Sequence, residues 1–241
     1  MPTAPAAPPQ WGPPNAGQPQ WGQPGYVRTP DWQRAAFRPS GGLAPAIYVL
    51  SVLYTVFTWL SQIIEPTEQT SLSDALEGNQ PADISFGAAE VIGLLSLPVL
   101  FGVWIVTSIW LSRARGNAVI LRPQGQRRSE GWAWFGWILP IVYLWFPKQI
   151  LDDTAAATGP ASGDHRPTGS NTYWTLWVMS ILISAAGVVA ALTSADESVV
   201  RSFGYAQAIV LTIALIPWIR LVRQISAAQD RLAADGVVGP E

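Results

Sequence analysis

The chain has 241 residues, 49% of them hydrophobic and only 12% charged, and its formal net charge is −2. Soluble domains usually carry about 25% charged residues, so this composition indicates a membrane protein. The chain contains no cysteine, which excludes structural disulfides, thiolate metal sites and cysteine nucleophiles.

Residues 1–40 predict a disordered cytoplasmic tail. They are rich in Pro, Gln, Gly and Trp, and the sequence PQWG occurs at 9–12 and again at 19–22. Such a composition cannot build a core and favours polyproline II conformation. It also lacks the basic region and apolar run of a signal peptide. Two interpretations stay open: a docking arm for a cytosolic protein with an aromatic-lined groove, or a spacer without a specific partner.

Four long apolar segments follow the tail. An α-helix rises about 1.5 Å per residue, so about 20 residues cross a hydrocarbon core of about 30 Å. Helices are expected because each segment must satisfy its own backbone hydrogen bonds in lipid. The predicted transmembrane helices cover residues 43–64, 86–111, 173–193 and 203–222. We therefore expect an all-α integral membrane domain over 41–232 and a short C-terminal tail over 233–241.

The stretch GWAWFGWILPIVYLWFPKQ, residues 131–149, raises a question of topology. It has no charge between Trp132 and Pro147 and is rich in aromatic residues, but Pro140 and Pro147 interrupt it. Proline removes a backbone donor and bends or ends a helix, and tryptophan favours the headgroup zone of a bilayer. These features predict a broken re-entrant or interfacial aromatic helix over 131–151 rather than a fifth span.

The distribution of basic residues favours four spans with both termini in the cytoplasm. Lys and Arg near the ends of spans stay on the cytoplasmic side. With four spans, 13 basic residues lie inside and one, Arg201, lies outside, whereas a fifth span would leave nine inside and five outside. The first outer loop, 65–85, carries five acidic residues and no basic one. We therefore predict a multi-pass protein of the cell (plasma) membrane, surrounded by the lipid bilayer.

The middle of the chain resembles a known bacterial family. The runs IWLSRARGNAVIL and SEGWAWFGWILPIVYLWFPKQILDDT are similar to the membrane-protein family labelled domain of unknown function 4328, and RLVRQISAAQDRL resembles the polar C-terminal helix of that family. The family pattern falls on Trp110, Asn117, Gly131, Trp132, Trp137, Pro140, Pro147 and Gln149. The resemblance covers roughly 45–232 and implies a fold, together with a Pro-rich cytoplasmic tail, but no activity.

Glu90 is the one ionisable residue well inside an apolar segment. A carboxylate in a membrane helix is a functional-site hypothesis, here for cation binding or proton relay. However, Glu90 lies only four residues from Phe86, at the outer end of its span, where its carboxylate reaches interfacial water. Glu90 is therefore either a site of a small transporter or channel, or an interfacial residue.

A basic cluster follows the second predicted span. Its members are Arg113, Arg115, Arg122, Arg127 and Arg128. Each basic residue near an anionic leaflet adds about 1 kcal/mol of attraction. The cluster either binds anionic lipid headgroups or the acidic surface of a partner, or acts as a topology anchor alone. We expect no nucleic-acid binding, because no aromatic-interleaved binding fold accompanies the charges.

The remaining polar candidates favour structural roles. Asp152 and Asp153 are paired as in some Mg²⁺ sites, but Asp152 also lies one helical turn from Lys148. We expect Asn117 to hydrogen-bond backbone carbonyls freed near a helix end. The single histidine, His165, has no second histidine or cysteine with which to share a metal.

The sequence therefore predicts a non-enzymatic scaffold or interaction protein that presents its tail and basic loop to cytosolic partners. We expect no catalytic residue, no cofactor and no metal site. The alternatives are a small transporter or channel that uses Glu90, and a lipid-modifying enzyme that uses the two aspartates.

Overall fold

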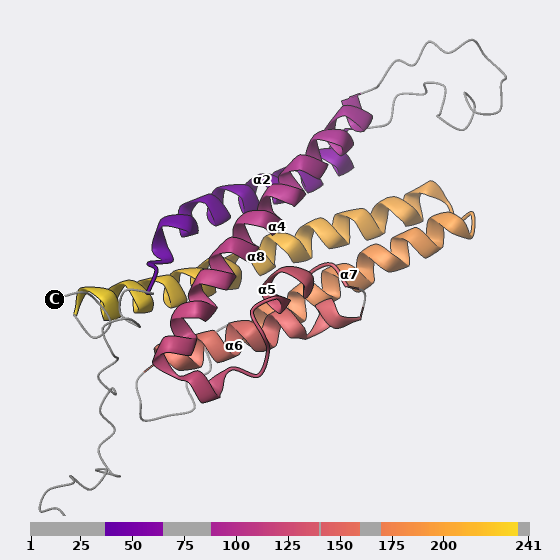
Figure 1. The fold of residues 1–241 in the computed structure, drawn as a ribbon. Helices are drawn as coiled ribbons and strands as arrows, with labels where there is room; N and C mark the ends of the chain where they lie inside the picture. Colours follow the sequence, from indigo (N-terminus) through magenta and orange to yellow (C-terminus); the bar gives the residue numbers. More distant parts are fainter. Residues whose placement is uncertain (1–36, 65–87, 140, 160–169, 236–241) are drawn as a thin grey trace, which may run out of the picture.

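The computed structural model describes residues 37–64, 88–139, 141–159 and 170–235, and all regular structure in them is helical (Figure 1). The elements are η1 (Gly41–Leu43), α2 (Ala44–Ile63), α4 (Ala88–Leu121), η2 (Pro123–Gly125), α5 (Trp132–Phe135), η3 (Val142–Leu144), α6 (Phe146–Thr158), α7 (Ser170–Leu192) and α8 (Glu197–Ala234). Most of the expected N-terminal tail, residues 1–36, lies outside the described residues, as do the loop 65–85 and the C-terminal residues 236–241.

Four of the described helices are long and apolar enough to cross a membrane. They are η1 with α2 (Gly41–Ile63), α4 from Val91 onward, α7 and α8, with mean hydropathies of 1.7, 2.1, 2.1 and 1.7 over their most apolar windows. The prediction of an all-α fold with four membrane-type helices is thus confirmed for the described part of the chain.

Two of these helices extend well past the predicted spans. Helix α4 continues beyond residue 111 to Leu121, and α8 begins before residue 203 and ends at Ala234. The added turns are polar, so hydropathy alone does not predict them. They form because their residues favour helix and because one face is apolar: in the added turns of α8, Ile225 and Leu232 are buried.

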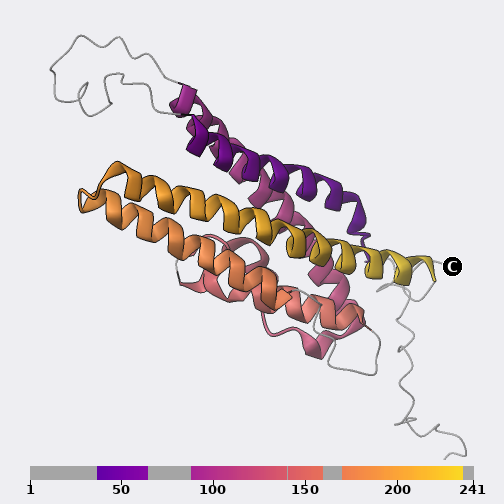
Figure 2. The ribbon, with the colours of Figure 1, turned by 180° about the vertical axis from the view of Figure 1, so that it is seen from behind.

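The helices form two antiparallel pairs, α2 with α4 and α7 with α8, and α8 also lies against α2 (Figures 1 and 2). At one end of the bundle Trp110 of α4, Trp218 of α8 and Tyr173 of α7 are in ring contact. At the other end, the Tyr205 hydroxyl of α8 donates a hydrogen bond to the Gln62 carbonyl of α2 at 2.9 Å. The C-terminal end of α4 and the N-terminal end of α7 are therefore at the same end of the bundle, and the chain between them returns to that end.

The aromatic stretch 131–149 is divided into three short elements rather than one long helix. Helix α5 ends at Phe135, the single turn of η3 follows, and Pro147 lies in the first turn of α6, where its missing N–H costs no hydrogen bond. Pro140 lies outside the described residues. The next residue, Ile141, has φ 69°, a conformation that a β-branched residue rarely adopts. The irregular backbone at Ile141 thus lies at the centre of the stretch, between α5 and α6.

Exposed apolar side chains mark a band around the four long helices. Large hydrophobic residues are exposed along α2, α4, α7 and α8, and the last of them toward the end that carries Trp110 and Tyr173 are Val49, Ile105, Met179 and Ile216. Beyond them, 106–121 of α4 and 217–234 of α8 continue as helix. We call this the polar end of the bundle. Such a band is the surface that a bilayer would cover.

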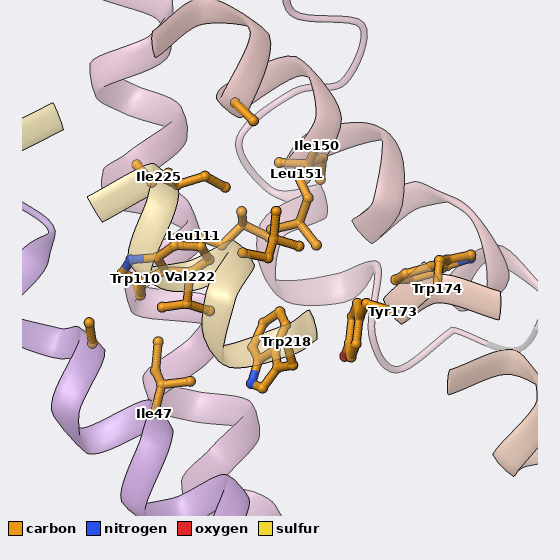
Figure 3. Packing of buried hydrophobic residues seen from close by; sticks show 14 of the residues in the cluster. Ile47, Trp110, Leu111, Ile150, Leu151, Tyr173, Trp174, Trp218, Val222 and Ile225 are labelled. Carbon is orange, nitrogen blue, oxygen red and sulfur yellow. The ribbon is translucent and has the colours of Figure 1, made fainter. Parts of the chain in front are cut away.

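Trp218 of α8 joins all four long helices near the polar end (Figure 3). Its ring stacks on Tyr173 of α7 at 4.8 Å and meets Trp110 of α4 edge-on at 6.3 Å. Its Nε1 donates a hydrogen bond to Ser51 Oγ of α2 at 3.1 Å. A second such link follows one layer further along, where Trp110 Nε1 donates to Ser226 Oγ at 2.9 Å. The core of the bundle is therefore centred on Trp218.

The Trp218→Ala substitution should destabilise the protein strongly. Truncating a buried Trp costs about 3–5 kcal/mol in a packed core, and here it also removes the contact with Tyr173. Trp145→Ala is the matched control, because Trp145 is 40% exposed. Reversible unfolding of both variants in mixed micelles measures the difference. Equal losses of unfolding free energy would contradict a central role for Trp218.

Candidate functional site

The polar end of the bundle contains a buried hydrogen-bond network, the polar junction, formed by Arg38, Ser40, Asn117 and Gln229. The Asn117 side chain holds the main chain of Arg38 at two points: Oδ1 accepts from the Arg38 N–H at 2.9 Å, and Nδ2 donates to the Arg38 carbonyl at 2.7 Å. Nδ2 also donates to Gln229 Oε1 at 2.9 Å. Asn117 is 1% exposed and Gln229 is fully buried.

Gln229 connects the junction to two further segments. Its Oε1 accepts from Ser40 Oγ at 2.8 Å, and its Nε2 donates to the Ala114 carbonyl of α4 at 2.8 Å. In the side-chain amides of Asn117 and Gln229, the NH₂ group donates and the carbonyl oxygen accepts hydrogen bonds. A buried amide needs partners for both groups. The junction fixes the point at which the chain enters α2, against the ends of α4 and α8.

The structure confirms that Asn117 hydrogen-bonds a backbone carbonyl, but it corrects which carbonyl that is. From the sequence we expect Asn117 to lie near the end of a helix, where backbone carbonyls have no hydrogen-bond partner within the helix. Helix α4 instead continues to Leu121, so the carbonyls before Asn117 remain in the helix. The carbonyl that Asn117 binds belongs to Arg38, 79 residues earlier in the chain.

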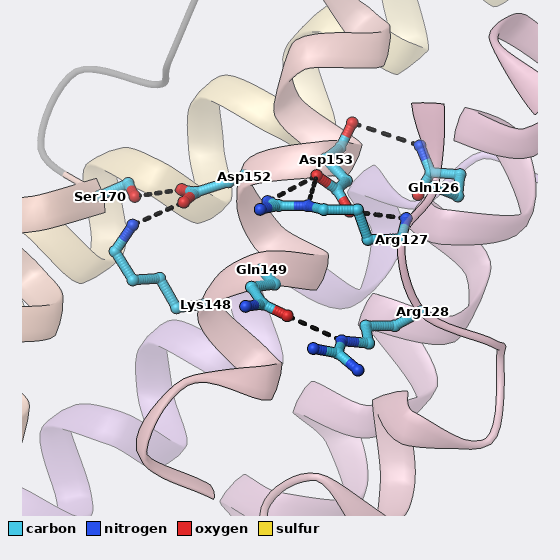
Figure 4. Close-up of polar contacts among 8 residues, drawn as sticks. All are labelled: Gln126, Arg127, Arg128, Lys148, Gln149, Asp152, Asp153 and Ser170. Carbon is cyan, nitrogen blue, oxygen red and sulfur yellow. Dashed lines mark hydrogen bonds and ion pairs between the residues drawn. The ribbon is translucent and has the colours of Figure 1, made fainter. Parts of the chain in front are cut away.

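The basic cluster lies largely in contacts within the protein (Figure 4). Arg115 donates from Nε to the Arg128 carbonyl at 2.9 Å. Arg128 donates from Nε to Gln149 Oε1 at 2.7 Å, and its guanidinium lies 3.7 Å above the Phe146 ring. The Arg115 and Arg128 contacts tie the loop 122–131 to α4 and α6. Arg113 is exposed on α4, and Arg122 precedes the turn η2.

Arg127 forms an ion pair with Asp153 of α6. Its Nη2 lies 2.8 Å from Asp153 Oδ1, its Nε donates to the same oxygen at 2.9 Å, and its backbone N–H donates to Oδ2 at 3.0 Å. The Asp153 carboxylate is only 10% exposed. Its hydrogen bond raises the pKa of the Arg127 guanidinium above the ordinary value. The buried Asp153 carboxylate thus holds the loop 122–131 against α6 through both the side chain and the backbone of Arg127.

The two adjacent aspartates do not converge on a common ligand. Asp152 pairs with Lys148, whose Nζ lies 2.5 Å from Oδ2, and accepts a hydrogen bond from the Ser170 hydroxyl. Asp153 points instead to Arg127 (Figure 4). The expected pairing of Lys148 with Asp152 is confirmed. Among the described residues, no group of three or more His, Cys, Asp or Glu is arranged to hold a metal ion.

Aromatic contacts hold the broken stretch against α4 and α7. Trp132 meets Phe146 edge-on at 4.6 Å. Trp137 packs against Trp174 and Trp177 of α7, with ring centroids 6.4 and 6.2 Å away. Trp104 of α4 is in edge contact with Trp134 at 5.9 Å. The stretch is thus a packed part of the bundle at its polar end.

Two backbone features fix the turn between α5 and α6. Trp174 Nε1 donates a hydrogen bond to the Leu144 carbonyl at 2.6 Å, so the carbonyl at the end of η3 has a partner. Pro147 is buried, and a Cβ on Gly136 would lie 3.5 Å from its ring. The elements α5 and α6 therefore approach closely at Gly136.

The predicted site residues thus separate into groups. Asn117 belongs to the polar junction, whereas Arg115, Trp132, Pro147 and Gln149 surround the contact between the basic loop and α6. Glu90 lies in the first turn of α4, but its side chain is outside the described residues, as are Pro140 and His165.

Sequence reasoning missed Ser40 and Gln229. The burial of Gln229 could have been predicted from the sequence. It shares a helical spacing with Leu221, Ile225 and Leu232, which lie on one buried face of α8. A polar residue in such a series indicates a buried hydrogen-bond partner. Ser40 had no comparable signal.

The Asn117→Leu substitution should lower the melting temperature in detergent, because it removes the partners of the Arg38 N–H and carbonyl and one of the two hydrogen bonds that Gln229 Oε1 accepts. Each buried polar group that loses its partner costs about 1–3 kcal/mol. Gln229→Leu should have a similar effect, and the double variant should cost less than the sum of the two, because both remove one network. An unchanged melting profile of Asn117→Leu would contradict the junction.

Comparison with protein-family models matches residues 73–227 to DUF4328, a domain of unknown function. The match is shorter at both ends than the resemblance over 45–232, but it includes α4, the broken stretch, α7 and most of α8. Comparisons with curated proteins and with solved structures found no match. Since the matched region covers more than half of the chain and contains the helices described above, the chain belongs to the DUF4328 family.

Proposed function

We propose that this protein is a non-enzymatic interaction protein of the bacterial plasma membrane. It crosses the bilayer four times, with both termini and the polar end in the cytoplasm. It presents the Pro-rich segment before Phe37, together with the basic surface of the polar end, to cytosolic proteins.

The charge of the polar end supports this orientation. Exposed arginines gather there on the entry to α2, on α4 and on α8: Arg38, Arg113, Arg220, Arg223 and Arg231. The opposite end exposes the acidic residues Asp196 and Glu197 at the start of α8. Basic residues remain on the cytoplasmic side of bacterial membranes, and anionic headgroups attract them.

The observation that carries the proposal is the double hydrogen bond from Asn117 to the main chain of Arg38. It fixes the last residues before α2 on the folded domain, so the preceding segment starts from a defined position. A Pro-rich segment with repeated Trp suits a partner that binds polyproline II conformations through an aromatic-lined groove. The residues that are fixed in this way, Arg38 and Ser40, lie at the end of the bundle that carries the exposed arginines.

Single cysteines test the orientation, because the chain has no native cysteine. We expect Ser73→Cys to react with a membrane-impermeant maleimide in intact cells, and Ser162→Cys and Ala234→Cys to react only after lysis. Labelling of Ser162→Cys and Ala234→Cys in intact cells would show that the polar end faces outward and would overturn the cytoplasmic assignment.

Site-specific photocrosslinking tests the interaction itself. A crosslinking amino acid at Gln10 or Gln20, within the two PQWG repeats, should yield discrete adducts with cytosolic proteins in living cells. The Trp11→Ala/Trp21→Ala variant should abolish these adducts at unchanged protein level, because the indole rings provide the apolar contact. The control is the same crosslinker at Ser73, in the loop on the other side. Adducts that persist after both Trp are removed would contradict recognition through the repeats.

A further inference from the structure

A cavity of about 480 Å³ lies between the four long helices, on the side of Trp218 away from the polar end. This volume is within the range of small-molecule sites, about 300–1,000 Å³. Helices α2 and α8 contribute Thr55 and Leu211, α4 contributes Val103, α7 contributes Trp177, and Trp137 of the broken stretch borders the cavity as well. The four long helices and residues 137–138 of the broken stretch therefore line one cavity.

The mouth of the cavity is on the apolar band. Three of its lining residues are strongly exposed hydrophobics: Leu100 is 42% exposed, Phe101 58% and Ile138 55%. They lie on α4 and on the broken stretch. Helices α4 and α7 pack mainly on other elements rather than on each other. An occupant would thus enter sideways, from the hydrocarbon that covers Leu100 and Phe101.

The lining is uncharged, with none of its residues being Asp, Glu, Lys, Arg or His. Several of its hydroxyls are already engaged: Thr55 Oγ1 donates to the Ser51 carbonyl, and Ser180 Oγ donates to the Trp177 carbonyl. Bare ions are poor occupants of such a space, because an unpaired charge is costly to bury. The lining suits a mainly apolar molecule.

Two polar atoms of the lining have no hydrogen-bond partner. Thr107 Oγ1 on α4 and Trp137 Nε1 on the broken stretch are both buried and unpaired. Thr107 is only 4% exposed. Ser108, Ser112 and Thr154 also carry an unpaired buried hydroxyl, outside the lining. Each such group calls for an explanation, and for the two beside the cavity a hydrogen-bonding group of an occupant supplies one. Trp137 can only donate, and Thr107 can donate or accept.

We propose that the cavity binds an acyl chain of a bilayer phospholipid, with the ester carbonyl as acceptor for Trp137 Nε1 and Thr107 Oγ1. The lining extends along α8 from Gln207 to Trp218, about 16 Å at 1.5 Å per residue, which suits an extended chain. Trp137 lies at the polar-end edge of the apolar band, the level at which lipid esters meet the hydrocarbon. This inference goes beyond the scaffold role and requires only that the helices span a bilayer.

Matched lipid probes test the carbonyl directly. The purified full chain is placed in nanodiscs of phosphatidylethanolamine and phosphatidylglycerol with a trace of phosphatidylethanolamine that carries a diazirine in one chain. That chain is joined by an ester in one probe and by an ether, which has no carbonyl, in the other. We expect the ester probe to label cavity residues such as Val103 and Trp177, and to do so about tenfold more than the ether probe, as two hydrogen bonds allow.

Variants separate the cavity from general lipid contact. Thr107→Val/Trp137→Phe should remove the difference between ester and ether probes. Leu211→Trp should fill the cavity and abolish labelling of Val103, whereas Ile213→Trp, two residues along α8 and 49% exposed outside the lining, should not. Gel filtration and melting profiles check folding, and the Thr107→Val change alone is nearly isosteric.

Three results would overturn the proposal. One is labelling confined to exposed residues such as Leu94 and Ile213. The second is equal labelling of the cavity by ester and ether probes in the unmodified chain. The third is undiminished labelling of Val103 in a folded Leu211→Trp variant.

Discussion

The packing of Trp218 sets the arrangement of the membrane domain. One side chain stacks on Tyr173, meets Trp110 edge-on and donates a hydrogen bond to Ser51, so a single residue of α8 contacts each of the other three long helices. Between membrane helices no hydrophobic driving force acts within lipid, and association depends on packing and on interhelical hydrogen bonds. Trp218 provides both kinds of contact. The polar junction lies on one side of this layer and the cavity on the other.

The two sides of the Trp218 layer have different chemistry because α4 and α8 are longer than a bilayer is thick. On one side, the four long helices expose many large hydrophobic residues. On the other, α4 and α8 continue as amphipathic helices that bury Ile225 and Leu232 together with Asn117 and Gln229. Side-chain amides and arginine–carbonyl hydrogen bonds link the elements there. The protein is thus a membrane bundle joined to a small polar cap by continuous helices.

Much of this fold follows from the sequence by itself. Continuous apolar runs predict helices because lipid leaves the backbone no other partner, and the prolines of 131–149 predict the break. The Lys148–Asp152 pair follows from helical spacing. The extensions of α4 and α8 do not follow, because their stability comes from packing against α6 and against each other rather than from hydropathy. The hydrogen-bond partners of Asn117 also could not be predicted from the sequence, since Arg38 and Gln229 are 79 and 112 residues away along the chain.

The position of the chain entry has a geometric consequence. Ser40 is bonded to Gln229, and a Cβ on the neighbouring Gly41 would meet the Asp230 carboxylate. Residues 37–40 therefore lie beside the last turns of α8. A side chain at position 41 would have to displace the Asp230 carboxylate, so the entry to α2 and the last turns of α8 are coupled by direct steric contact.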